Sequence, residues 1–399
     1  IIGRGVCTPK RRSKKKSESK KLKPELAISV AGWRRSGALP AHKRTILRLS
    51  SEKPNNPSPP RNRDQNMVTD RESPPRILVM GKRGGILQWP EHVFNACRKM
   101  NLDCRFLALN HQSSTDRFVK RAKGLVSKQW QDSHLAQQLG ILLQTFKPEL
   151  LILPDLIALP EAVQAVLKQF KPQFKSAYWI GDFFPESIRH YNDFIDRFYF
   201  TDSHLQQQGC DLGLNRATYL PLAVDVSLFQ PLAKPWQQRD HKVLFVGAYS
   251  ENRYQMLRAI ERPVQIYGKG WDKPMPSSHQ VHSRNIPLAD VARLYGSHRY
   301  VLNIINSNNI KHGLNMRCFE TVSAGAVLIT DRVADLPRCF NANDPVITYG
   351  DLAELNSILI KLDQHSIRGH SGPNTDALMK YDYTDRVLSM MRDNLGTRH

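Results

Sequence analysis

The sequence predicts an α/β protein built from two doubly wound, Rossmann-like domains that face a central cleft. From Pro75 onward, short apolar runs alternate with helix-like segments, which is typical of a parallel sheet covered by helices on both faces. The alternation pauses at residues 230–240, a polar segment with two prolines, and then begins again. With 40% hydrophobic residues in a chain of 399, there are enough apolar side chains for ordinary cores.

The first domain is expected over residues 76–230. Its opening run, RILVMG, is continuously apolar, as in a strand buried on both faces, and Gly84 and Gly85 follow it. An amphipathic stretch then predicts a helix from Trp89 to Met100. We expect further strands at 104–110, 149–155, 176–182, 197–202 and 217–225, a polar helical region that ends near 146, and a helix over 159–170.

The second domain is expected over residues 231–399. We expect its strands at 242–250, 263–270, 299–305, 326–331 and 345–349, and its helices at 252–261, 288–295, 316–324, from about 351, and around 383–394. Ligands of such sheets bind outside the carboxyl ends of the strands, so two halves of this kind predict a ligand cleft between them.

Positive charge is concentrated at the start of the chain. Residues 1–75 hold 19 Lys and Arg against 6 Asp and Glu, more than half of the net charge of +22. The segment has no periodic apolar face, which predicts a disordered basic leader. Since the first methionine is Met67, we interpret the leader as an extension that the fold does not need. A basic arm for nucleic acid or an anionic membrane, or a transit peptide, is the alternative.

Several classes of protein are excluded by motifs that the sequence lacks. No apolar run reaches the roughly 18–20 residues of a membrane helix, so we expect no stable membrane insertion. The six cysteines form no CxxC pair, which favours reduced thiols in a cytoplasmic protein. The chain has no D-x-D pair, no G-x-x-x-x-G-K-[ST] loop, no G-x-S-x-G turn and no H-x-x-x-H pair, so we expect no metal and no bound cofactor.

The segment KHGLNMRCFETVSAGAVLITD, residues 311–331, is the most informative one. A loop with Gly313 enters a helix at Asn315, a good N-cap residue, and the free backbone N–H groups there favour an anion. Lys311 and Arg317 add positive charge to the same place. Glu320 lies one and a half turns into the helix, where a carboxylate can accept hydrogen bonds from ribose hydroxyls. An ordinary helix with an exposed Arg/Glu pair is the simpler interpretation of the same residues.

This segment resembles the donor-binding motif of GT-B glycosyltransferases, in particular group-1 proteins related to the spore maturation protein CgeB. The motif is G-x-N-x-R-x-F-E followed by a small-residue helix end, a glycine and a strand, and this chain matches it at Gly313, Asn315, Arg317, Phe319, Glu320 and Gly325. Four other segments resemble landmarks of the family in the same order, namely WIGDFFPE (179–186), YLPLAVDVSLF (219–229), FVGAYSENR (245–253) and IYGKGW (266–271).

The resemblance implies a GT-B fold whose last helix packs back on the first domain, and it implies roles for individual residues. Glu320 would contact the ribose, as the second glutamate of an E-x7-E pattern whose first position is His312 here, a departure from that pattern. Arg253 and Arg317 would face the diphosphate. Asp182 would be a general base toward the acceptor hydroxyl, unless it is a strand-end cap. The remaining residues implied in donor binding are Gly247, Tyr267, Gly268, Lys311, His312, Gly313, Leu314 and Asn315.

The function implied is transfer of a sugar from a nucleotide-diphosphate sugar to an unidentified acceptor, which could be a glycan, a protein or a lipid, without a metal. His312 at the glutamate position keeps a second interpretation open, a nucleotide-sugar epimerase or a nucleotide-sugar binder without transferase activity. A third is a nucleic-acid-binding protein that acts through the basic leader, although we do not expect nucleic acid as a partner.

Removal of residues 1–66 tests the interpretation of the leader. A chain that starts at Met67 should keep the melting temperature and the activity of the full chain, because the leader cannot bury enough apolar area to offset its ordering entropy. Differential scanning calorimetry of both chains measures this. A loss of several degrees would show that the leader packs on the fold, and salt-sensitive DNA binding that disappears with it would favour the nucleic-acid interpretation.

Overall fold

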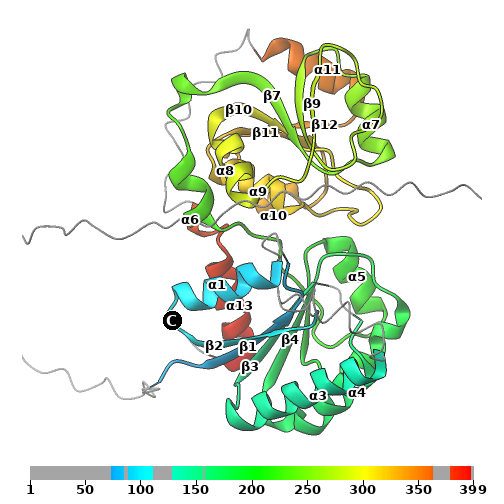
Figure 1. Ribbon diagram of the computed structural model, residues 1–399, viewed down its shortest axis with the longest axis vertical. Coiled ribbons are helices and arrows are strands. Elements are labelled where there is room, and N and C mark those ends of the chain that lie inside the picture. Colours follow the sequence, from blue (N-terminus) through cyan, green and yellow to red (C-terminus); the bar gives the residue numbers. More distant parts are fainter. Residues whose placement is uncertain (1–72, 85–88, 111–127, 156–157, 363–377, 397–399) are drawn as a thin grey trace, which may run out of the picture. The chain divides into compact units, whose positions relative to one another are not determined.

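The computed structural model describes residues 73–84, 89–110, 128–155, 158–362 and 378–396. The predicted leader lies outside these residues except for 73–75. The described chain forms two six-stranded sheets, in which all strands are parallel (Figure 1). We call the sheet β1–β6 with its helices, including the last helix α13, the first lobe, and the sheet β7–β12 with its helices the second lobe.

The first sheet has the strand order β2-β1-β3-β4-β5-β6, so the order reverses between β1 and β3. Apolar runs that are buried on both faces explain its central strands, since every residue of β3 is buried. The strands are β1 (Arg76–Gly81), β2 (Asp103–Ala108), β3 (Leu150–Pro154), β4 (Lys175–Ile180), β5 (Arg197–Phe200) and β6 (Thr218–Tyr219).

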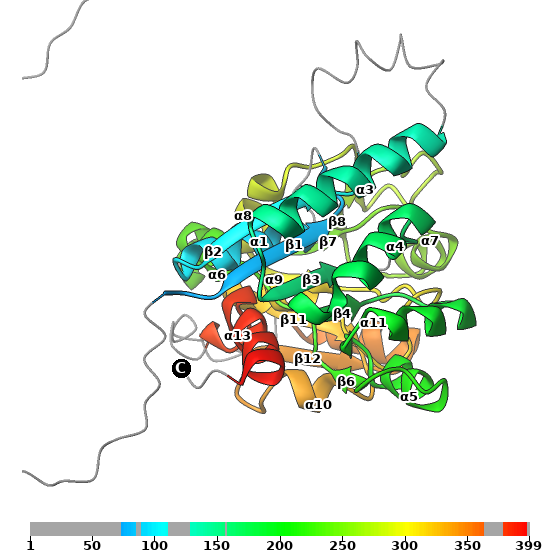
Figure 2. The same ribbon diagram turned by 90° about the horizontal axis from the view of Figure 1, so that it is seen from below.

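Helices cover both faces of the first sheet and form two cores. On one face lie α1 (Trp89–Lys99) and α13 (Tyr383–Leu395), which pack side by side (Figure 1). The other face is covered by α3 (Lys128–Thr145), α4 (Glu161–Phe170) and α5 (Ser203–Asp211). Figure 2 shows α3 and α4 running beside each other along that face.

The second sheet has the order β12-β11-β10-β7-β8-β9, which is the order of dinucleotide-binding Rossmann folds and reverses between β7 and β10. Its strands are β7 (Asp240–Val246), β8 (Val264–Gly268), β9 (Gln280–Ser283), β10 (His298–Leu302), β11 (Val327–Asp331) and β12 (Val346–Tyr349). One face packs on α7 (Glu251–Arg258) and α11 (Leu352–Lys361), the other on α8 (Leu288–Ser297) and α9 (Met316–Ser323). The short helices α6 (Val226–Phe229) and α10 (Leu336–Cys339) complete this lobe.

The predicted class, two doubly wound α/β halves, is confirmed, and the differences are local. The strand predicted over 217–225 is only two residues long, because the chain leaves the sheet at Leu220 toward the second lobe. The strand β9 and the helix α5 were not predicted, since the sequences QVHS and SHLQQQGCD are too polar to give an apolar period.

The last helix brings the end of the described chain back to the first lobe. Val224 forms a parallel bridge with Asp382, and the Val226 N–H donates to the Asp382 carboxylate at 2.9 Å. From there α13 inserts Tyr383, Val387 and two methionines into the core beneath α1. The whole second lobe is therefore an insertion between two segments that lie side by side.

A carboxylate of the first lobe binds the second lobe through backbone N–H groups. Asp202, at the end of β5, accepts from the N–H groups of Lys311, His312 and Gly313 with its Oδ2 atom, at 2.8, 2.9 and 2.9 Å. Its Oδ1 atom caps α5 by accepting from the His204 N–H at 2.8 Å. Burial alone would raise the pKa of Asp202, but these donors lower it, so the carboxylate is ionised.

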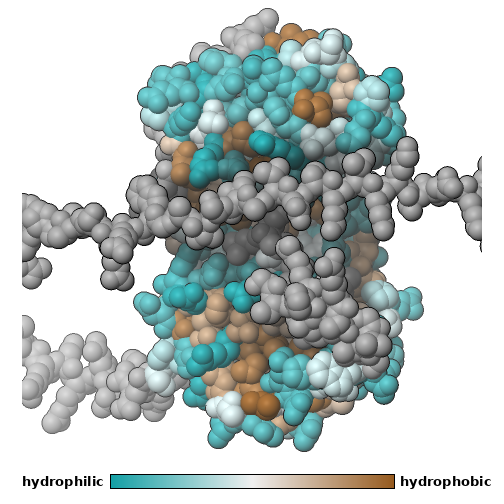
Figure 3. Space-filling view, viewed as in Figure 1, coloured by the Kyte–Doolittle hydropathy of each residue, from teal (hydrophilic) through white to brown (hydrophobic). Residues whose placement is uncertain are grey.

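The exposed surface of the described residues is mostly polar. In Figure 3 apolar residues gather mainly over the part of the first lobe that carries α3 and α4, where Trp130 and Ile141 of α3 are about half exposed. None of the helices in the described ranges is long and apolar enough to cross a membrane. The five cysteines in these ranges form no disulfide with one another.

Replacement of Asp202 tests how much the contact between the lobes contributes. Asp202→Ala should lower the free energy of unfolding by about 3 kcal/mol, because it removes a helix cap and a buried acceptor of several N–H groups. Asp202→Ser should recover about 1 kcal/mol, since serine caps α5 but is too short to reach residues 311–313. Urea unfolding measures both. Asp211→Ala, at the exposed end of α5, is the control, and equal values for all three variants would exclude the contact as a stabilising feature.

Candidate functional site

A cleft of about 560 Å³ lies at the carboxyl ends of the strands of both sheets, a volume typical of small-molecule sites. It opens at the two positions where the strand orders reverse, after β1 and β3 in the first sheet and after β7 and β10 in the second. Its polar and charged lining residues are Trp89, His92, Asp155, Arg253, Lys269, Arg284, Asn285, Asn306, Asn309, Asn315, Arg317 and Glu320.

Two arginines make the second-lobe side of the cleft a site for an anion. Arg253 of α7 is fixed by hydrogen bonds from its guanidinium to the carbonyls of Ile304 and Ala248, both at 3.1 Å. Burial lowers the pKa of Arg253, and the nearby charge of Arg317 lowers it further. Because the two cations disfavour each other, an anion with two charges, such as a diphosphate, would relieve the repulsion.

Glu320 is a buried carboxylate that lines this cleft. Its side chain is 8% exposed, and its Oε2 atom has no hydrogen-bond partner among the described residues. Arg317 approaches the same oxygen only to 4.0 Å. Burial raises the pKa of Glu320, while Arg317 lowers it. An unpaired buried acceptor costs about 1–3 kcal/mol, so this carboxylate is prepared to accept a hydrogen bond from a ligand.

Asn315 stands at the start of α9, but its side chain does not cap the helix as predicted. Its amide instead donates to the Oδ1 atom of Asn303 at 3.0 Å. Asn303 is buried and in turn donates to Thr330 and Cys318, at 3.0 and 3.3 Å. This network ties the first turn of α9 to the ends of β10 and β11.

Gly247 and Gly268 meet where the loops after β7 and β8 touch, and both line the cleft. Gly268 has φ +152°, and a Cβ there would lie 1.9 Å from the Gly247 carbonyl oxygen, so only glycine fits. That oxygen accepts from the indole of Trp271 at 2.8 Å. The predicted pocket residue Tyr267 is not among the lining residues; its ring stacks on His282, with centroids 4.2 Å apart.

In the loop before α9, three consecutive backbone N–H groups are already used. The N–H groups of Lys311, His312 and Gly313 are used by Asp202, as described above. The His312 side chain contacts Ser203 at 3.1 Å, and Leu314 is buried in the core. None of these four residues lines the cleft, so the predicted loop joins the lobes instead.

Asp182 follows β4 but does not line the cleft either. Its carboxylate accepts from the amide of Asn309 at 2.9 Å. Asn309 does line the cleft, so Asp182 fixes a residue of the second lobe at the rim. The expected role as general base is thus not supported by its position, because its carboxylate is bound to this amide.

Three cleft residues of the first lobe were missed by the sequence analysis. Trp89 and His92 lie in the first turn of α1, and Asp155 follows β3 with φ +77°, a strained value for a residue other than glycine. No motif marks them. The signal that could have found them is their place directly after the first and third strands, where ligands of doubly wound sheets bind.

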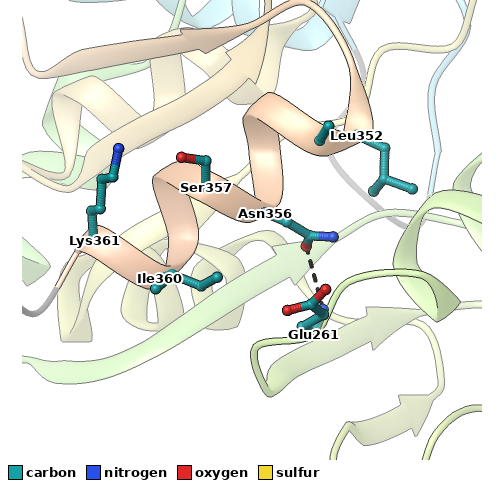
Figure 4. Close-up of a pocket in the computed structure, with 7 residues that line it drawn as sticks. Glu261, Leu352, Asn356, Ser357, Ile360 and Lys361 are labelled. Carbon is teal, nitrogen blue, oxygen red and sulfur yellow. Dashed lines mark hydrogen bonds between the residues drawn. The ribbon is translucent and has the colours of Figure 1, made fainter.

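A second hollow, of about 740 Å³, lies on α11 beside Glu261 and is lined by Leu352, Asn356 and Ile360 among others (Figure 4). The Asn356 side chain accepts from the Glu261 N–H at 3.3 Å and donates to a backbone carbonyl at 3.2 Å. None of its lining residues has a buried side-chain atom without a partner in the described ranges, so nothing there demands a ligand.

Comparisons with known proteins agree with this fold. Residues 252–384 match a family model described as glycosyl transferase-like, a segment that includes α9 with Arg317 and Glu320. No curated protein matches the chain. The second lobe therefore contains a glycosyltransferase-like domain.

Solved structures of glycosyltransferases resemble both lobes together. A glycosyltransferase from Rickettsia africae matches with 9% identity and a TM-score of 0.58, over 82% of this chain and 100% of that one. Anabaena HepE in complex with UDP and glucose, and the UDP-forming α,α-trehalose-phosphate synthase of Burkholderia vietnamiensis, both match with 12% identity and a TM-score of 0.54. Both matches cover 80% of this chain; they extend over 99% of HepE and 100% of the synthase. The chain has the GT-B fold, as predicted.

The buried His92 predicts a pH dependence of stability. Burial lowers its pKa to about 4, with a contribution from Lys99, while Asp225, Glu91 and Asp382 oppose the shift. In the unfolded chain the imidazole takes up its proton near pH 6.5. The contribution of the neutral imidazole to the free energy of unfolding is therefore fully present above pH 6.5. It is lost as the pH falls toward 4, and the total loss is about 3 kcal/mol.

Urea unfolding of the parent and of His92→Phe at pH 7 and pH 4.5 measures this contribution. The parent should lose more stability than the variant over this interval, by about 2–3 kcal/mol, because phenylalanine cannot be protonated. Identical losses in the two proteins would show that His92 is not the group concerned.

Proposed function

We propose that this protein is a glycosyltransferase that binds a nucleotide-diphosphate sugar in the cleft and transfers its sugar to an acceptor hydroxyl. The observation that carries the proposal is Glu320, a buried carboxylate in the second turn of the cleft helix α9, with an oxygen that has no partner among the described residues; two arginines line the same cleft. A carboxylate suits ribose hydroxyls and the arginines suit a diphosphate, so together they match two neighbouring parts of one donor molecule.

The second lobe, residues 231–399 apart from α13, would hold the donor, and the first lobe, residues 76–230, the acceptor. Arg253 and Arg317 would bind the diphosphate together with the N-terminal turn of α9. The UDP in HepE and the UDP-forming reaction of the trehalose-phosphate synthase support a uridine nucleotide as the first donor to test. The motif from Gly313 to Glu320 supports a CgeB-like subgroup, and the free thiols suit a cytoplasmic protein.

The transfer step follows from this placement. The acceptor oxygen forms a bond to the anomeric carbon of the sugar, and the bond from that carbon to the diphosphate oxygen breaks. The nucleoside diphosphate leaves with the electron pair, and the acceptor hydroxyl releases its proton to solvent water. Charge grows on the diphosphate as it departs, and the two guanidinium groups stabilise it, so the proposal needs no metal. Asp182 would act as a positioning residue through Asn309.

A nucleotide-sugar binder or epimerase is the second candidate, and His312 is the observation that favours it. The first carboxylate of the E-x7-E pattern is replaced by this histidine, whose ring contacts Ser203 and does not line the cleft. Detection of a glycosylated product with the nucleotide diphosphate released in equal amount would distinguish transfer from binding, and a changed sugar on an intact nucleotide would indicate epimerisation.

Substitution of Glu320 and Arg317 tests the proposed function. Glu320→Ala should weaken binding of the donor by about 10- to 150-fold, because hydrogen bonds to charged groups contribute about 1.5–3 kcal/mol. Glu320→Gln keeps one acceptor oxygen and should therefore weaken donor binding less than Glu320→Ala does. Arg317→Ala should lower kcat more than it raises KM, if its partner charge grows in the transition state. Calorimetric titration with UDP-sugars and steady-state kinetics measure these effects.

Glu354→Gln is the matched control, since Glu354 pairs with Arg332 at 2.6 Å on the exposed surface and does not line the cleft. It should bind the donor as the parent does. If the Glu320 and Arg317 variants instead melt far below the parent while their folded fraction binds donor normally, the pair is a structural feature of α9 and the proposal is wrong.

A further inference from the structure

Two polar groups of the first lobe remain unused by the donor site. The Trp89 Nε1 atom and the His92 Nδ1 atom are buried without a hydrogen-bond partner among the described residues, and both residues line the cleft. His92 is only 4% exposed. Each such group costs about 1–3 kcal/mol when left unpaired, and together with the Oδ1 atom of Asn309 and the Oε2 atom of Glu320 they are four in one cleft. A ligand that bridges the lobes would satisfy them.

These two groups are joined to the donor side by direct contacts. The His92 ring stacks on Tyr383 of α13, with centroids 5.0 Å apart and planes inclined by 2°. The Tyr383 hydroxyl reaches the sulfur of Met316 at 3.0 Å, and Met316 lines the cleft in the first turn of α9. The wall from α1 across α13 to α9 is therefore continuous, and a molecule at Trp89 and His92 lies in the same cleft as the donor.

The chemistry of this wall favours neutral hydroxyl groups. Since the pKa of His92 lies near 4, the imidazole is neutral at pH 7 and can accept a hydrogen bond at Nδ1. The indole N–H of Trp89 can only donate. Asp155 is the third polar first-lobe residue at the cleft, and it is a carboxylate that Lys82 approaches to 3.9 Å. No cationic residue of the first lobe lines the cleft in the described ranges, so the first lobe itself supplies no positive lining residue for a phosphate.

The ring of Trp89 is held rigidly. It packs edge-on against Trp179 with centroids 4.7 Å apart, and its outer atoms lie close to Gly181, where an added Cβ would be 3.0 Å away. Its Nε1 atom consequently has a fixed direction, and rigid donors lose little entropy when they bind. The ligand oxygen that accepts from this N–H group must therefore have the right position as well as the right charge.

We propose that the first turn of α1 is the acceptor subsite, and that the acceptor is a neutral sugar or glycoside that carries no phosphate. Trp89 Nε1 donates to one of its oxygens and His92 Nδ1 accepts from one of its hydroxyls. This rests on the proposed glycosyltransferase function and adds the class of the second substrate. It differs from the glucose-6-phosphate in the complex of a trehalose-phosphate synthase from Burkholderia xenovorans that shares the fold.

Saturation-transfer NMR on the full chain with saturating UDP tests the proposal. The probes are methyl glucoside, methyl galactoside and N-acetylglucosamine, each compared with the 6-phosphate of its parent sugar. At least one neutral probe should bind, and its phosphate should neither bind more tightly nor displace it. Tighter binding of the phosphates, or no binding of any neutral probe while UDP binds, overturns the proposal.

Variants locate the subsite. His92→Phe and Trp89→Phe keep an aromatic ring but remove the polar atom, and each should weaken the neutral probe by about 3- to 10-fold. His92→Gln keeps a polar group and should therefore weaken binding of the neutral probe less than His92→Phe does. The controls Trp130→Phe and His134→Phe alter a stacked Trp/His pair on the exposed side of α3, with centroids 5.2 Å apart, and should have no effect. Parent-like binding in both α1 variants would contradict the assignment.

Titration with UDP separates this proposal from the proposed function. The α1 variants should bind UDP as the parent does, because their side chains lie on the first lobe. If the parent itself fails to bind any nucleotide, the donor proposal fails. If nucleotide binding is normal and only the neutral sugars fail, the acceptor subsite alone is wrong.

Discussion

The contact of one carboxylate with three consecutive backbone N–H groups determines how this protein is arranged around its cleft. Asp202 is 1% exposed and lies between α5 and the loop that leads into α9. Gly313 approaches the first lobe so closely that a Cβ there would be 2.8 Å from the Thr201 carbonyl oxygen. Because α9 begins three residues later, this contact places Arg317 and Glu320 opposite the first turn of α1.

Polar groups beneath the cleft have hydrogen-bond partners, whereas some polar groups that line it do not. Beneath it, Asn303, Thr330 and Asn315 are bonded to one another, and the Gly247 carbonyl is bonded to Trp271. At its surface, Glu320 and His92 each keep a buried polar atom without a partner in the described chain. Buried groups of this kind destabilise the unliganded protein, whereas the rigid support beneath them keeps the site from collapsing.

The sequence predicted the fold and the second-lobe lining of the cleft better than the first-lobe lining, for physical reasons. Strands such as β1 are continuous apolar runs, and the motif that carries Arg317 and Glu320 is one contiguous segment, so both can be recognised locally. His92 reaches its place in the cleft through stacking on Tyr383, about 290 residues away along the chain, and Trp89 through packing on Trp179, 90 residues away. The contact of residues 311–313 was not predicted for the same reason, since their partner Asp202 is more than 100 residues upstream.

The path of α13 has a consequence for the order in which the protein can be made. Tyr383, Val387 and Met390 complete the apolar core under α1 and the first sheet, so the first lobe takes part of its interior from the last segment of the described chain. During synthesis from the N-terminus, the ribosome delivers every strand of that sheet long before this helix. The part of this face that α1 does not cover must then stay open while the second lobe is translated, so the first lobe begins to form first and is completed last.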